Sequence, residues 1–182
     1  EDIFPEISRA VPSGGTPSGL SGKAGNRAET ARDYLVRRHK LKAHQAAGVV
    51  GNLVQESNMT PWGVVGDNGT AFGLAQWRHE RFANLKSYAA RTGRSHKDFY
   101  TQLDFIVHEG NTTERGAWSR LLASRDVTQA TAAMIGYERP QGWKPNNPQG
   151  GHGWSNRLRN AVALARGQAA PQSAVPAAYQ AP

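Results

Sequence analysis

The chain has 182 residues, a formal net charge of +8 and no cysteine, so it can form one domain with a sizeable core but no disulfide framework and no thiolate metal site. Its pI of about 10.2 predicts a polyanionic partner, for which nucleic acid and the bacterial envelope are the two candidates. The mean hydropathy is −0.63 and the apolar runs are only a few residues long, so no segment is expected to span a membrane.

The two ends of the chain have the composition of flexible segments. Residues 1–26 contain prolines and a Ser/Gly cluster, and residues 168–182 are rich in Ala, Pro and Gln. Because neither can bury enough apolar surface to order itself, we expect a linker at 1–26, one domain over 27–167 and a flexible tail at 168–182. The residues after Glu1 lack the basic and apolar regions of a signal peptide, so we expect either a processed product or an excerpt of a longer protein.

Between these ends, the spacing of apolar residues predicts helices. Asn26 is suited to cap a first helix that runs to about residue 39, with Glu29 placed as in a capping box. Alanine, valine and leucine recur with a helical period over 43–56 and predict a second helix. Further helices are expected over residues 79–92, 95–109, 113–124, 127–137 and 155–166.

Two segments do not follow a helical pattern. Residues 64–72, with glycines at the turn, are the only candidate for a β-hairpin, and residues 141–153 are too rich in Gly, Pro and Asn to be regular. The sequence therefore predicts a mainly α fold with a small hairpin or irregular lobe beside a cleft.

Residues 51–77, GNLVQESNMTPWGVVGDNGTAFGLAQW, contain the densest set of polar groups suited to catalysis. The helix over 43–56 ends at Glu56, and the glycine-rich loop that follows carries Asp67 and Thr70. Taken singly, these residues have ordinary explanations as a helix-terminal glutamate, a turn residue and a strand residue. Two carboxyl groups on opposite walls of a cleft are what glycosidic bond cleavage requires, so their combination favours a glycosidase.

The position of Glu56 on its helix predicts an acid role. At about 100° per residue, Glu56 is expected beside Leu53 and Val49 rather than on the solvent face. Apolar surroundings penalise the charged form of a carboxyl group. We therefore expect Glu56 to stay protonated near neutral pH and to donate to a leaving oxygen.

Three blocks of sequence carry a family resemblance. The pattern AAGVVGNLVQESNMTPWGVVGDNGTAFGLAQWRHERFANL resembles the core motif of the phage tail lysozymes, and QLDFIVHE at 102–109 and YERP at 137–140 are similar to the later blocks of that family. The blocks follow the family's order and cover about residues 27–165. The resemblance implies a lysozyme-like α+β fold with a small β-hairpin or irregular lobe beside the active-site cleft, and no cofactor.

The resemblance also implies catalytic roles at three positions. Glu56 matches the general acid that ends the first long helix of lysozyme-like folds. Asp67 and Thr70 resemble the Asp and Thr that position water or stabilise the cation in phage lysozymes, although they lie closer to the glutamate here.

A second similarity, to lytic transglycosylases, implies substrate-binding residues. Glu56-Ser57 followed by Gly-Leu-Ala-Gln76 is similar to the ES…GLMQ signature of those enzymes, in which the Gln lines the sugar cleft. Tyr137 resembles the tyrosine that faces their catalytic glutamate. Together with Trp77, whose ring is suited to stacking on a sugar, the predicted substrate-binding residues are Ser57, Gln76, Trp77 and Tyr137.

Several other residues stand out in the sequence, and most of them are expected to have structural roles. Trp118 is expected in the core or on the surface, whereas Trp143 and Trp154 are candidates for a cleft rim. Glu138 is expected to be a buried partner of Arg139 or of another arginine, with a supporting catalytic role as the alternative. The six histidines lack the paired spacing of a zinc site, so no metal is expected.

Two classes of function are consistent with the sequence. The first is a muramidase that cleaves the MurNAc–GlcNAc β-1,4 bond, with hydrolysis favoured by the presence of Asp67 and a lytic transglycosylase that leaves 1,6-anhydro ends as the alternative. Its expected partners are peptidoglycan strands and other subunits of a virion tail or an envelope-spanning assembly, and its expected location is the phage tail or the bacterial periplasm and envelope. The second class is a non-catalytic module that binds glycan or nucleic acid. A glycan binder should have lost the acid, and a nucleic-acid binder should carry a known motif, which the sequence lacks.

Overall fold

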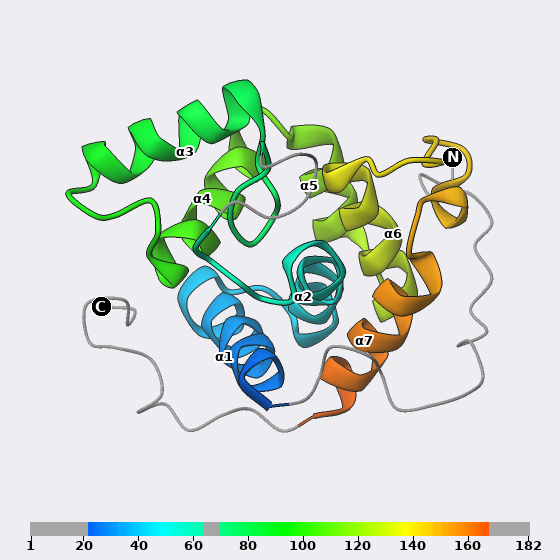
Figure 1. The fold of residues 1–182 in the computed structure, drawn as a ribbon. Coiled ribbons are helices and arrows are strands. Elements are labelled where there is room, and N and C mark those ends of the chain that lie inside the picture. The colour runs from blue at the N-terminus through cyan, green and yellow to red at the C-terminus, as the bar shows by residue number, and fades with distance from the viewer. Residues whose placement is uncertain (1–21, 64–69, 168–182) are drawn as a thin grey trace.

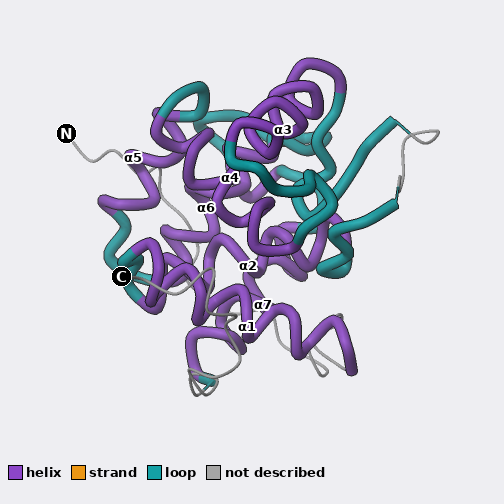
Figure 2. Tube along the Cα trace, turned by 90° about the vertical axis from the view of Figure 1, so that its left-hand side faces the viewer, coloured by secondary structure: helices purple, strands orange, loops and turns teal. Residues whose placement is uncertain are grey.

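The computed structural model describes residues 22–63 and 70–167, and these ranges hold seven α-helices (Figures 1 and 2). In chain order the elements are α1 (Gly22–His39), α2 (Ala43–Ser57), α3 (His79–Arg91), α4 (Phe99–Asn111), α5 (Arg115–Ala123), α6 (Val127–Glu138), the 3-10 helix η2 (Pro148–Gly150) and α7 (Trp154–Arg166). The predicted mainly α fold is therefore confirmed. The predicted tail at 168–182 and most of the predicted linker lie outside the described residues, and both ends of the domain stay predictions.

Helix α2 is the central element of the fold. Figure 1 shows it end-on, with α1, α6 and α7 arranged around it, and every residue from Gln45 to Val54 is buried. A Cβ atom at Gly48 would lie 2.6 Å from the Cβ of Ala130 on α6, and one at Gly51 would lie 2.7 Å from the carbonyl oxygen of Arg157 on α7. The two glycines thus allow α6 and α7 to approach the axis of α2 more closely than a larger residue would permit.

The helix boundaries follow the sequence closely except at α1 and α4. Helix α4 begins at Phe99, four residues after the predicted start, because the carboxylate of Asp98 accepts a hydrogen bond from the backbone N–H of Thr101 at 2.8 Å and caps the helix. Helix α1 begins at Gly22, so the predicted capping role of Asn26 is wrong. Asn26 lies inside α1, where its carbonyl oxygen accepts a hydrogen bond from the hydroxyl of Thr30.

The predicted hairpin over residues 64–72 is not seen, and residues 64–69 lie outside the described ranges. In the part of the chain that the structure describes, strand-like pairing is limited to two isolated bridges, Phe72 with Trp77 and Lys144 with Asn147. The described part of the small lobe before α3, residues 58–63 and 70–78, is therefore irregular rather than β. No helix within the described ranges is long and apolar enough to cross a membrane.

The side chain of Gln102 on α4 fixes this irregular lobe to the helical body. Its Oε1 accepts a hydrogen bond from the backbone N–H of Leu74 at 2.9 Å, and its Nε2 donates to the carbonyl oxygen of Pro61 at 2.6 Å. Gly73 has a φ of 77°, and a Cβ there would lie 2.8 Å from Oε1 of Gln102. The turn that carries Gln76 is thus held in place by one buried amide.

Candidate active site

A polar cavity of about 570 Å³ opens where α2 and α6 end and α7 begins. This volume is typical of a small-ligand site. The cavity lining contains two carboxyl groups, four guanidinium groups, three amides and one imidazole. These belong to Glu56, Glu138, Arg78, Arg81, Arg139, Arg157, Gln55, Gln76, Gln141 and His152. Such a lining suits a ligand with many hydroxyl and charged groups.

Glu56 reaches this cavity from the last turn of α2. Its carboxylate accepts a hydrogen bond from Nη2 of Arg157, with a distance of 2.5 Å between Nη2 and Oε1, and its side chain is 19% exposed. The apolar surroundings predicted for the carboxylate are therefore not observed. Leu53 and Val49 lie fully inside the core, one and two turns earlier, whereas the end of α2 meets the polar side of α7.

Arg157 is held on all three of its nitrogen atoms. Besides Glu56, it donates from Nη1 to the side-chain oxygen of Asn52 at 3.1 Å and from Nε to the carbonyl oxygen of His152 at 3.0 Å. Asn52 is itself buried and donates to the carbonyl oxygen of Gly48. Because each of the three nitrogen atoms donates to a separate acceptor, and Arg157 itself is buried, the guanidinium group presents a fixed positive charge to Glu56.

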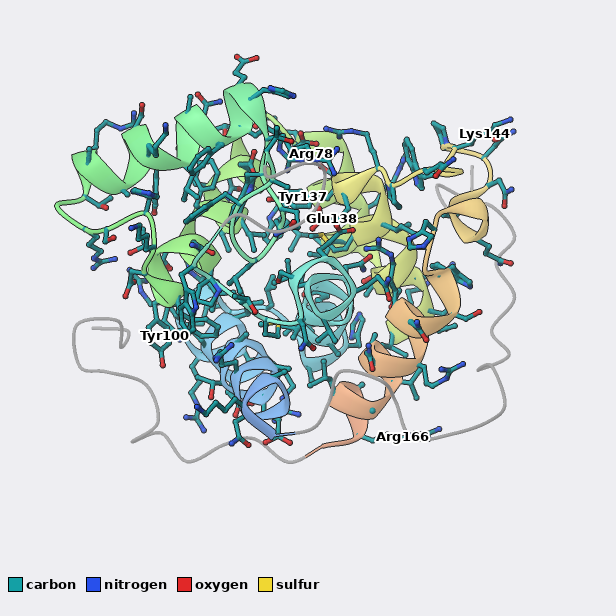
Figure 3. The ribbon with its side chains drawn as sticks, viewed as in Figure 1. Arg78, Tyr100, Tyr137, Glu138, Lys144 and Arg166 are labelled. Atoms are coloured by element: carbon teal, nitrogen blue, oxygen red, sulfur yellow. The ribbon has the colours of Figure 1, made fainter. Side chains whose placement is uncertain are left out.

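Glu138 is the second carboxyl group in the cavity, and it lies at the end of α6 (Figure 3). Its predicted partner Arg139 instead binds both carboxylate oxygens of Glu114, at 2.7 and 3.0 Å, so that pairing is wrong. Oε1 of Glu138 is buried and has no hydrogen-bond partner among the described residues. Burial first, and then the charge of Glu56, raise the pKa of Glu138 well above its ordinary value.

A buried cluster around Glu109 forms the wall behind the cavity. Glu109 Oε1 accepts hydrogen bonds from the Trp77 indole at 2.7 Å and from the Tyr137 hydroxyl at 2.5 Å, and its Oε2 accepts one from Nε of Arg81 at 2.9 Å. The guanidinium of Arg81 also lies 4.5 Å from the centre of the Tyr137 ring. Burial raises the pKa of Tyr137, and the charge of Glu109 adds to this effect, so its hydroxyl stays a donor. The cluster fixes Arg81, which lines the cavity.

A family model described as phage tail lysozyme matches residues 26–166. The chain belongs to the phage tail lysozyme family. Membership of this family implies peptidoglycan degradation, with peptidoglycan as the substrate and the phage tail as the location. A search of curated proteins found no match.

Of the three residues predicted to be catalytic, two lie within the described ranges. Glu56 lines the cavity. Thr70 is exposed and is not among the described residues of the cavity lining, and Asp67 lies outside the described ranges. The catalytic roles of all three stay predictions.

The residues predicted to bind substrate are divided between the cavity and the core. Gln76 lines the cavity, and its Nε2 donates to the carbonyl oxygen of Gly73. Ser57 is buried, with its hydroxyl bonded to the carbonyl oxygen of Leu53, and Trp77 and Tyr137 are 1% and 0% exposed. In this structure neither ring offers a face on which a sugar could stack.

Sequence reasoning missed Arg157, Arg81 and Glu109 as parts of the site. Glu109 ends the QLDFIVHE block, which was the only available signal for it, whereas nothing local distinguishes Arg157 from the other arginines of its helix. Trp118 is buried in the core, and Trp143 and Trp154 are partly buried outside the described lining. No group of three His, Cys, Asp or Glu residues able to hold a metal occurs within the described ranges.

Proposed function

We propose that this chain is a muramidase that cleaves the β-1,4 bond between MurNAc and GlcNAc, with Glu56 as the general acid. The observation that carries the proposal is the position of Glu56. It lies in the last turn of the central helix α2 and lines a polar cavity of about 570 Å³. Family membership supports peptidoglycan as the substrate, and a positioned proton donor is what cleavage of a glycosidic bond needs.

In this proposal a glycan strand lies in the cavity with its bridging oxygen at Glu56. Proton transfer to that oxygen releases the leaving sugar and produces an oxocarbenium-like centre at C1. Asp67 and Thr70, which follow α2 in the sequence, then direct water to C1 or stabilise its charge. Gln76 hydrogen-bonds sugar hydroxyls. Since Ser57, Trp77 and Tyr137 are buried, we assign to them the shaping of the cavity wall rather than stacking.

The charge of the chain supports action at a bacterial surface. Its formal net charge is +8, and bacterial envelopes are anionic. We therefore propose that the domain acts as the cell-wall-penetrating module of a phage tail, with neighbouring tail subunits as its protein partners.

A lytic transglycosylase is the second candidate for the reaction. It is favoured by one observation, namely that Gln76 of the Gly-Leu-Ala-Gln segment lines the same cavity as Glu56. In that reaction the 6-hydroxyl of the muramic sugar attacks C1, and no second carboxylate is needed. The two candidates share the proton donor and differ in their products.

Digestion of purified peptidoglycan tests the proposal. Wild-type protein should clear a peptidoglycan zymogram, and Glu56→Gln should lower the rate by about 10²–10⁴-fold while the protein stays folded. Clearing by Glu56→Gln at the wild-type rate would rule out this acid.

Mass analysis of the released fragments separates hydrolysis from transglycosylation. Hydrolysis predicts free reducing ends and a large loss of rate in Asp67→Asn. A digest dominated by 1,6-anhydro ends, with Asp67→Asn as active as wild type, identifies a lytic transglycosylase instead.

A further inference from the structure

We propose that Glu138 and Glu56 form a carboxyl pair that holds a single proton at neutral pH, and that Glu138 carries this proton before the reaction begins. The inference rests on the proposed glycosidase function and deepens it. It adds a second carboxyl group, from α6, to a site in which the sequence predicts only Glu56 and Asp67.

The first line of evidence is the position of Glu138. Its side chain lines the same cavity as Glu56, and its Oε1 is buried without a hydrogen-bond partner among the described residues. Glu138 is also the last residue of α6, where the negative end of the helix dipole opposes a negative charge. A buried carboxylate oxygen that lacks a donor is costly, whereas a protonated carboxyl group in the same place is far less so.

The second line of evidence is the charge around Glu138. Glu56 on α2, which lines the same cavity, contributes a negative charge, and Glu109 on α4 adds a further one. Arg81 from α3 and Arg157 from α7 oppose these charges. Both arginines are already engaged, Arg81 by Glu109 and Arg157 by Glu56, and the net effect is a raised pKa for Glu138. The remaining charged or titratable groups of the cavity lining are Arg78, Arg139 and His152.

The number of protons in the pair follows from these contacts. The short hydrogen bond from Arg157 is made to the charged form of Glu56, so two protons on the pair would leave a buried guanidinium group without its counter-charge. No proton on the pair would place two negative charges in one cavity, one of them on a buried oxygen without a donor. One proton, on Glu138, avoids both costs.

The proton balance of the reaction is consistent with this arrangement. The pair supplies one proton, which Glu56 donates to the bridging oxygen as the bond from C1 to that oxygen breaks, and this leaves the pair with none. The hydroxyl group that then forms a bond to C1, from water or from the sugar itself, loses its proton to the pair. Each turnover therefore ends with one proton on the pair, as it began.

The dependence of kcat/KM on pH tests the proposal. In wild-type protein the basic limb should follow the loss of the proton from Glu138. Glu138→Gln lacks this carboxyl group, so the basic limb should move to lower pH, with a loss of about tenfold or more at pH 7 and little loss at pH 5. Glu138→Asp retains a titrating carboxyl group and should restore part of the limb. Glu29→Gln, an exchange at an exposed position of α1, should reproduce the wild-type profile.

Infrared difference spectra of the full chain give a readout that does not need activity. At pH 7, wild type minus Glu138→Gln should show the C=O stretch of one protonated carboxylic acid. If this band is present but neither the wild-type protein nor any variant digests peptidoglycan, the protonated Glu138 is supported and the proposed glycosidase function is wrong. Absence of the band, or a pH profile of Glu138→Gln that matches wild type or falls equally at every pH, overturns the proposal for Glu138.

Discussion

Nη2 of Arg157 lies 2.5 Å from Oε1 of Glu56, although the two residues are 101 positions apart in the chain. The contact depends on the close packing of α7 on α2, where the backbone of Arg157 lies directly over Gly51. A glycine in one helix and an arginine in another thus place the predicted acid at the mouth of the cavity.

Replacement of Arg157 by glutamine should lower both stability and activity. The change leaves the carboxylate of Glu56 without its buried donor, and loss of one partner of such a pair costs about 3–5 kcal/mol. We expect a lower melting temperature, and a lower kcat/KM on peptidoglycan at temperatures where the variant is folded. Arg166→Gln, at the exposed end of the same helix (Figure 3), should change neither quantity. Wild-type values for Arg157→Gln would show that this contact does not position Glu56.

Replacement of Gly51 by alanine should destabilise the protein by forcing α2 and α7 apart. The new Cβ would lie 2.7 Å from the carbonyl oxygen of Arg157, and overpacking of this kind costs about 1–3 kcal/mol. Gly116→Ala on α5 is the matched control, because a Cβ at this position would have no atom within 4 Å. This exchange should stabilise the helix by about 0.5–1 kcal/mol. Chemical denaturation measures both changes, and equal stabilities for the two variants would contradict the packing argument.

Tyr137→Phe distinguishes a buried support from a substrate contact. The variant loses the hydroxyl that donates to Glu109, which should cost about 0.5–3 kcal/mol of stability, while Trp77 and Arg81 still bind the carboxylate. Since the ring is fully buried, kcat/KM should stay close to the wild-type value. Tyr100→Phe, which lies outside the described cavity lining, controls for the loss of a hydroxyl. A large loss of activity with an unchanged melting temperature would instead indicate direct contact with the sugar.

The stability of the protein should depend on pH through Glu138. Because its pKa is raised on folding, the unfolded chain releases this proton first as the pH rises. The stabilisation is therefore complete below the ordinary pKa of 4.5 and is lost as the pH rises through the higher pKa of the folded state. In Glu138→Gln this loss should disappear, so the difference in melting temperature between variant and wild type should grow in favour of the variant from pH 4 to pH 8. A constant difference across that range would contradict the raised pKa.

Local sequence patterns were sufficient to predict the helices and the place of Glu56. The predicted bounds of α2 and α6 are correct to within one residue. Both helices are buried on nearly all sides, every residue from Gln45 to Val54 in α2 and from Thr128 to Ile135 in α6, so each is an apolar segment of helical length. The pattern could not show that α1 begins at Gly22. The buried position Gly25 extends its packed face into a segment that has the composition of a linker.

The partners of the charged residues were decided only by the tertiary structure. Adjacency in sequence suggested Arg139 as the partner of Glu138, yet Arg139 binds Glu114, and Glu138 lines the same cavity as Glu56. Likewise, Trp77 follows a predicted cleft residue in sequence but turns into the core to donate to Glu109. The sequence shows which residues share a helix face, because residues three or four positions apart lie on the same face. The neighbours of a buried charge come from other helices, and their identity depends on how closely the backbones approach, which in this protein is set at Gly48 and Gly51.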